Sequence, residues 1–63
     1  MDYEDLLIVA MKKEKQSFRF YHMTASIMDD KELEKLFLML AQEEAKHKLR
    51  FEVEYDKIIL NEK

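Results

Sequence analysis

Apolar residues recur with the period of an α-helix in two stretches of this chain. The first stretch predicts a helix over about residues 3–28, and the second predicts a helix over about residues 31–60. Asp2, Glu4 and Asp5 give the first helix an acidic start, which suits the positive end of its dipole. Nearly the whole chain is therefore expected to be helical.

A chain reversal is expected at Asp29-Asp30, between the two periodic stretches. Asp29 followed three residues later by Glu32 has the form of a capping box, with Asp29 as the N-cap of the second helix. So short a link makes the two helices antiparallel neighbours. The predicted fold class is all-α, with residues 1–63 forming one antiparallel two-helix hairpin.

The apolar residues of each helix fall into two groups. The inner stripe, along which the two helices should face each other, contains Leu7, Ala10, Met11, Glu14, Ser17, Phe18, Tyr21, Ala25 and Met28 on the first helix and Leu33, Phe37, Leu40, Glu44, His47, Phe51 and Ile58 on the second. The outer set contains Val9, Phe20, Met23 and Ile27 on the first helix and Leu38, Leu49, Val53 and Leu60 on the second. One hairpin cannot bury both groups, so we expect a homodimer, or a larger homo-oligomer, in which hairpins pair into a four-helix bundle.

Composition leaves few ways to stabilise so small a unit. A chain of 63 residues seldom gains more than about 3–5 kcal/mol from a single core. The absence of cysteine excludes disulfides, thiolate metal sites and cysteine nucleophiles, and the absence of glycine and proline favours uninterrupted helices. Bound metal or association with other chains remains as a source of stability.

The charge pattern argues against nucleic-acid and membrane partners. The formal net charge is −3, and the lysines and arginines are scattered among acids. The longest apolar run, residues 6–11, is far too short to span a bilayer, and the first residues lack the basic region of a secretory signal. We expect a cytoplasmic protein.

The most informative motif is Glu44-x-x-His47, because three-residue spacing on a helix points a carboxylate and an imidazole at one spot, where they can hold one metal ion. Glu14 is an isolated acid in the inner stripe, about as far before the reversal as this pair lies after it. An antiparallel hairpin would bring all three residues to one level. An ionised carboxylate in an apolar stripe is costly unless it is paired or bound to a cation.

Each of these residues also has a plainer interpretation. Glu14 could be a protonated or hydrated acid at the edge of the stripe, and His47 could be a packed or partly exposed histidine. Glu44 could form an exposed ion pair with Lys48, four residues later. Glu43 competes as a ligand through its four-residue spacing to His47, but the inner stripe favours Glu44.

Two hairpins related by a twofold axis would combine four glutamates and two histidines at one site. This is the donor set of dinuclear carboxylate centres in four-helix bundles. Four carboxylates would neutralise two divalent ions per dimer and leave open positions for dioxygen or peroxide. The oxygen and imidazole donors suit iron or manganese, and zinc or cobalt could also bind.

The segments Met11-Lys12-Lys13-Glu14 through Phe20-Tyr21 and Leu36-Phe37 through Leu40-Ala41-Gln42-Glu43-Glu44-Ala45-Lys46-His47 resemble the rubrerythrin-like branch of the ferritin-like superfamily. The similarity covers nearly all of this chain but half of a usual family domain, as in the two-helix, encapsulated-ferritin type of arrangement. The resemblance implies iron ligands at Glu14, Glu44 and His47, a dimer whose turns lie at opposite ends, and a hydrogen-bonding or redox role for Tyr21 near the site. Plain core packing is an equally good interpretation of Tyr21.

The chain departs from the family pattern in two respects. Without cysteine it has no attached rubredoxin-type electron donor, and the tail Asn61-Glu62-Lys63 has no apolar encapsulation-type signal. Glu54, two turns beyond His47, could belong to an additional metal site, as extra glutamates do in some relatives, or could be a solvated acid.

The resulting hypothesis is a protein that binds two iron ions per dimer and oxidises Fe(II) with dioxygen or peroxide. One alternative is peroxide reduction at the same centre with electrons from a separate electron-transfer protein. The other is a metal-free helical module whose stripes only mediate assembly.

Overall fold

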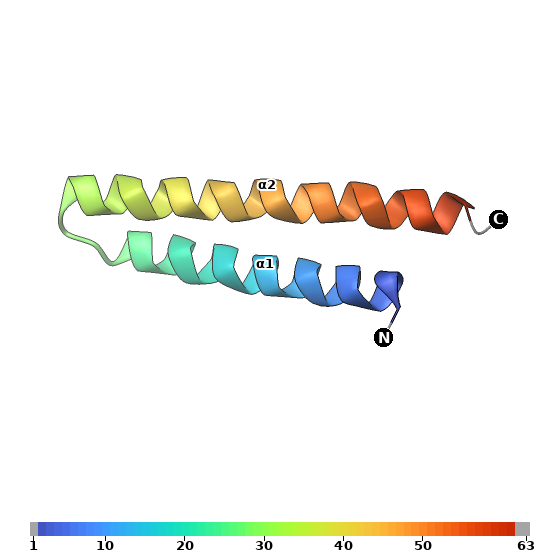
Figure 1. Ribbon diagram of the computed structural model, residues 1–63. Coiled ribbons are helices and arrows are strands. Elements are labelled where there is room, and N and C mark those ends of the chain that lie inside the picture. The colour runs from blue at the N-terminus through green and yellow to red at the C-terminus, as the bar shows by residue number, and fades with distance from the viewer. Residues whose placement is uncertain (1, 62–63) are drawn as a thin grey trace.

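The computed structural model describes residues 2–61 as two antiparallel helices joined by a short turn (Figure 1). Helix α1 spans Tyr3–Ser26, and helix α2 spans Lys31–Asn61. The Cα trace is 50 × 17 × 11 Å, and α2 projects past the start of α1 because it is 31 residues long against 24. The predicted all-α hairpin is confirmed for the described residues.

Helix α1 begins where its acidic start provides a cap and ends earlier than predicted. The Asp2 side chain accepts a hydrogen bond from the backbone N–H of Asp5 at 3.0 Å, which satisfies one of the free donors of the first turn. At the other end, the helix stops at Ser26 and not at residue 28. The hydroxyls of Thr24 and Ser26 donate to the carbonyls of Phe20 and Met23, and such local hydroxyl bonds compete with continued helix.

The turn contains no residue with positive φ among those described, so it closes without glycine. The cap of α2 is Asp30, and the prediction of Asp29 as the N-cap was wrong by one position. The Asp30 carboxylate accepts from the backbone N–H groups of Glu32 at 2.8 Å and Leu33 at 3.1 Å. Because α2 begins at Lys31, only the acid immediately before it is placed to reach these donors.

Replacing Asp30 with alanine is expected to destabilise the hairpin by about 1 kcal/mol, because two N–H groups of the first turn lose their acceptor. Asp29→Ala is the matched control and should change the unfolding free energy little. Urea denaturation at one fixed protein concentration measures both. Equal losses from the two variants would show that charge near the helix start matters and the capping geometry does not.

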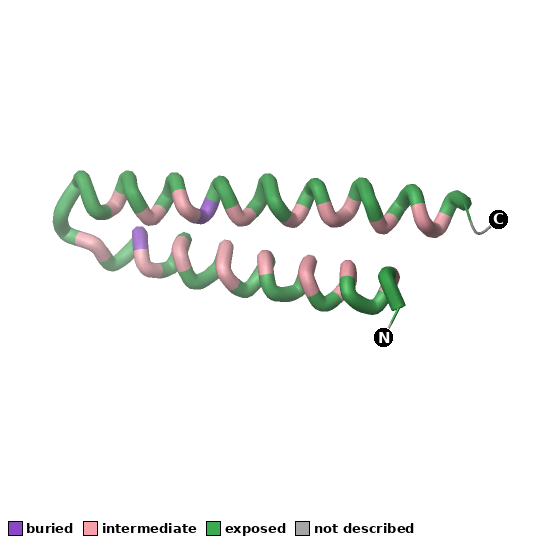
Figure 2. Tube along the Cα trace, in the orientation of Figure 1, coloured by how far each residue is buried: buried purple, intermediate pink, exposed green. Residues whose placement is uncertain are grey.

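Side chains of the inner stripe lie between the helices. In Figure 2 the half-buried segments of each helix face the other helix. Every inner-stripe residue of α1 is buried or half-buried, and on α2 only Leu33 and His47 of the stripe are exposed. Within residues 2–61, however, only Ala25 and Ala41 are buried, each 2% exposed.

The outer set is exposed throughout residues 2–61, as the sequence predicts. Ile27 and Leu60 are the most open members, at 72% and 67%. A single hairpin therefore encloses almost no core of its own, and its large apolar side chains need further cover. Neither helix of the described chain combines the length and apolar character needed to cross a membrane.

Candidate metal centre

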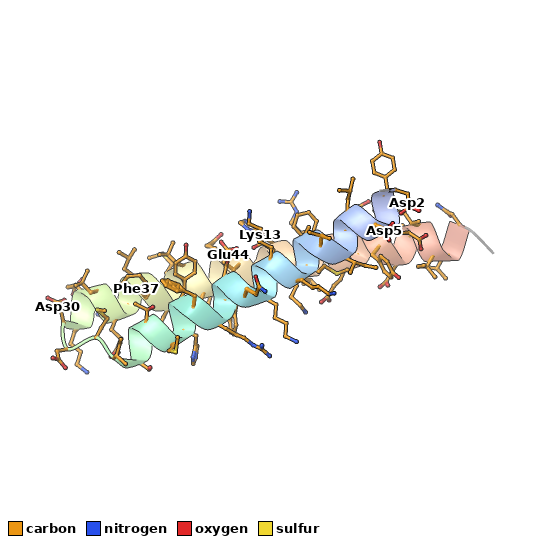
Figure 3. All side chains as sticks on the ribbon, turned by 90° about the horizontal axis from the view of Figure 1, so that it is seen from below. Asp2, Asp5, Lys13, Asp30, Phe37 and Glu44 are labelled. Carbon is orange, nitrogen blue, oxygen red and sulfur yellow. The ribbon has the colours of Figure 1, made fainter. Side chains whose placement is uncertain are left out.

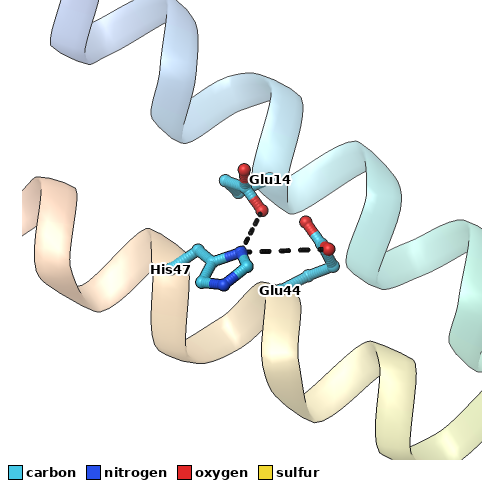
Figure 4. Close-up of side chains that lie close together, drawn as sticks. All are labelled: Glu14, Glu44 and His47. Carbon is cyan, nitrogen blue, oxygen red and sulfur yellow. Dashed lines mark ion pairs between the residues drawn. The ribbon is translucent and has the colours of Figure 1, made fainter.

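Glu14 of α1 and Glu44 and His47 of α2 converge (Figure 4), and Glu44 lies near the middle of the hairpin (Figure 3). The His47 Nδ1 atom lies 3.6 Å from Glu14 Oε2 and 3.9 Å from Glu44 Oε1. One potential ligand atom from each residue falls within 4.8 Å of the others. The antiparallel packing of α1 on α2 brings Glu14 to the level of the Glu44-x-x-His47 turn, as its distance from the reversal predicts.

The two acids are mostly shielded from water, whereas the histidine stands at the edge. The side chains of Glu14 and Glu44 are 18% and 20% exposed, against 47% for His47. Glu14 Oε2 is buried and accepts no hydrogen bond, because the His47 nitrogen is too distant for one. In Figure 4 the second ring nitrogen of His47 points away from the carboxylates. The three residues thus leave one side of the cluster open.

The pKa of Glu44 is raised above its usual value of 4.5. The largest cause is that a protonated Glu44 carboxyl can donate a hydrogen bond to Glu14, followed by burial and by the negative charge of Glu14. His47 acts in the opposite direction, because a positive imidazolium favours the carboxylate. Without a cation, the neighbouring Glu14 carboxylate therefore opposes ionisation of the shielded Glu44.

Replacing Glu44 with glutamine should stabilise the metal-free protein at pH 7 by about 0.5–1 kcal/mol, since the amide can donate to Glu14 without adding charge. The raised folded-state pKa means that Glu44 favours folding below its usual pKa and loses this contribution as pH rises through the folded value. The advantage of the variant should therefore vanish near pH 4. Thermal unfolding in chelator at both pH values tests this, and Glu43→Gln is the matched control.

The donor set fits a divalent metal ion. Two carboxylates and one imidazole are the oxygen and nitrogen donors that iron and manganese accept. A cation between them would supply the partner that Glu14 Oε2 lacks and would remove the repulsion between the two acids. No other histidine or acid of residues 2–61 joins this group.

The competing ion pairs leave Glu44 free for the cluster. Glu43 pairs with Lys46 at 3.5 Å on the exposed flank of α2. Lys48 pairs with Glu52, and so the alternative pair between Glu44 and Lys48 is absent from the described chain. Glu44, and not Glu43, is the glutamate that meets His47, as the inner stripe predicts.

The two tentative site residues lie outside the three-residue cluster. Tyr21, two turns after Glu14, stacks on Phe37 with ring centroids 6.3 Å apart. This contact is the packing that the plainer interpretation expects. Glu54 pairs with Lys57 at 3.2 Å and lines a surface hollow of about 560 Å³ together with His47. Their roles near a metal centre stay predictions.

A hairpin with a glutamate on one helix and Glu-x-x-His on the other supplies half of the ligands of a dinuclear carboxylate four-helix bundle. Comparison with known families agrees with this class, because residues 5–63 match the family model described as Rubrerythrin. The chain belongs to the rubrerythrin family, a ferritin-like family whose members usually bind iron. Searches of curated proteins and of solved structures found no match.

Proposed function

We propose that two copies of this chain bind two iron ions at a shared site and oxidise Fe(II) with dioxygen or peroxide. The observation that carries the proposal is the converging trio of Glu14, Glu44 and His47, in which one buried carboxylate oxygen lacks a hydrogen-bond partner among the described residues. Membership of a family that usually binds iron supports iron as the metal.

A second copy is needed because one hairpin offers too few ligands for two ions. Its two carboxylates balance one divalent ion, so the four carboxylates of a dimer balance two. His47 lies on the open side of the cluster, and the exposed side chains of Leu33 and Leu36 lie along the same side of α2. A second hairpin on this side would cover these leucines and bring its own trio to the first.

The chain's own residues would hold the metal and tune its surroundings. Glu14 and Glu44 supply negative charge, and the His47 imidazole presents Nδ1 to the same point. The rigid helices fix the spacing of these donors, while Leu40 and Phe51, one turn to either side, limit access of water. Iron bound there would supply the electrons that reduce dioxygen or peroxide.

Anaerobic titration with ferrous iron tests the proposal directly. Two ions should bind per dimer, and admission of air or peroxide should produce a ferric absorption band. Rapid mixing with each oxidant shows which one oxidises the bound iron, and a requirement for a separate electron donor distinguishes peroxide reduction from ferroxidase activity. Absence of stoichiometric iron uptake would refute both enzyme hypotheses.

A further inference from the structure

Helix α2 carries a second exposed stripe that the metal centre does not use. We define the Leu49 stripe as Leu38, Gln42, Ala45, Leu49, Val53, Asp56 and Leu60, all of which are exposed. Their spacings of three or four residues place them on one face of the helix. Leu49 is two residues from His47, roughly 200° around the helix, so this face is opposite the open side of the metal cluster.

The residues of the Leu49 stripe are spaced symmetrically about its centre. Ala45 and Val53 lie four residues on either side of Leu49, Gln42 and Asp56 lie seven, and Leu38 and Leu60 lie eleven. We propose that a second copy of this chain docks antiparallel along this stripe, with the twofold axis at Leu49. Each residue would then face its counterpart at the same distance from the axis.

The facing pairs are complementary in size and polarity. Small Ala45 would face Val53 of the partner subunit, and Leu38 would face Leu60 of the partner subunit. Gln42 would face Asp56 of the partner subunit, which gives an amide donor to a carboxylate. Leu49, which is 59% exposed in the hairpin, would be covered by the partner's Leu49.

A hollow beside Ala45 is ready to receive a side chain from the partner. It has a volume of about 420 Å³, and Phe18, Ala45 and Leu49 form its apolar part. The hollow is open because the Ala45 side chain is only a methyl group. In the antiparallel arrangement, Val53 of the partner subunit faces Ala45 and would enter the hollow. The stripe therefore combines projecting residues with a recess, as interdigitating helices require.

The rim of this hollow carries charge of the right sign for the partner's acids. Lys15 and Arg19 line it and form no ion pair in the described chain. Helix α1 runs antiparallel to α2 and hence parallel to the α2 helix of the docked copy. Since Glu14 is level with Glu44 and His47, Lys15 is level with Ala45, and Arg19 is one turn nearer the chain reversal.

This register places Lys15 opposite Glu52 of the partner subunit and Arg19 opposite Asp56 of the partner subunit. Both pairs have the same four-residue spacing, so they would form together. Glu52 already pairs with Lys48 in its own chain, whereas Asp56 has no ion pair there. Substitution of Arg19 and Asp56 therefore tests the proposed contact most directly.

On the flank of the Leu49 stripe away from the hollow, like charges disfavour close contact. Lys46 and Arg50 lie there and would face like charges in the antiparallel arrangement. Glu43 already neutralises Lys46, which reduces this repulsion. The helices should therefore lean toward the flank that carries Lys15 and Arg19.

The experiment uses the His47→Ala chain in chelator, which removes association through the metal centre. Sedimentation equilibrium should give a dimer. Its dissociation constant should rise at least about tenfold with Arg19→Glu, and likewise with Asp56→Arg, because the twofold axis places each substitution in two equivalent contacts. The chain carrying both Arg19→Glu and Asp56→Arg should regain the original affinity, since the pair is restored with its charges exchanged.

Lys13→Glu is the matched control, because Lys13 is exposed on the other flank of α1, roughly 120° around the helix from Arg19, and its replacement should leave the dissociation constant unchanged. Circular dichroism checks that every variant stays helical. A monomer at all concentrations, or failure of the double substitution to restore affinity, would overturn the proposal. If the chain stayed monomeric and bound an acidic helical peptide, the hollow would belong to another partner. Because His47 is absent throughout, these outcomes are independent of iron binding.

Discussion

Replacing His47 with alanine is expected to weaken ferrous iron binding by at least about 100-fold, since even residues that only support a metal ligand cost 10- to 100-fold when lost. Glu14→Ala should have a comparable effect, because it removes the carboxylate that α1 contributes. Anaerobic titration followed by metal analysis of the desalted protein measures the loss, and the ferric band after exposure to air should disappear with it.

Glu43→Ala provides the matched control for these variants. Glu43 is adjacent to Glu44 in sequence and carries the same charge, but it pairs with Lys46 on the exposed flank. Its removal should leave iron stoichiometry and oxidation unchanged. If Glu43→Ala and Glu14→Ala reduced iron uptake equally, iron would be held by surface charge in general and not by the converging cluster.

Metal should raise the thermal stability of the protein strongly. A ligand present at 100 times its dissociation constant stabilises the folded state by about 2.7 kcal/mol. For so short a chain this corresponds to a rise in Tm of roughly 10–20 °C. Such a gain is a large part of the total stability of a hairpin in which only Ala25 and Ala41 of the described residues are buried. Calorimetry with ferrous iron under anaerobic conditions, and with chelator, measures it at one protein concentration.

The same measurement separates the metal protein from a helical assembly module. In the module, the stripes alone stabilise the oligomer, and Tm should be the same with and without chelator. The His47→Ala variant is the internal control, because it should melt like the chelated protein under both conditions. If metal still raised the Tm of this variant, the stabilising ion would be bound at a site that does not include His47.

Periodicity along the chain was sufficient to predict the fold because the two helices bury one face each and have no competing element. The ends of the helices were harder to predict. Two adjacent aspartates offered equivalent capping signals, and only the observed start at Lys31 selects Asp30 over Asp29. Likewise, α1 ends at Ser26, where the hydroxyls of Thr24 and Ser26 bond to backbone carbonyls, and periodicity does not report such bonds.

The meeting of Glu14, Glu44 and His47 could be predicted because each lies on the inner stripe and at one level of the hairpin. The sequence did not reveal how unequally they are shielded, with the acids covered and His47 half exposed. Nor could it reveal that Glu14 raises the pKa of Glu44, because that depends on the distance between side chains from different helices. The open side of the cluster at His47 depends on how the two helices pack and could not be predicted from their sequences.

One hairpin contributes a single set of Glu14, Glu44 and His47. In a twofold assembly, every inherited change at these positions would alter both halves of the centre at once. The two metal positions could then never diverge in affinity or reactivity by mutation of one gene. A chain with two fused copies of the hairpin would be free of this restriction, so gene duplication is the route by which such a centre could become asymmetric.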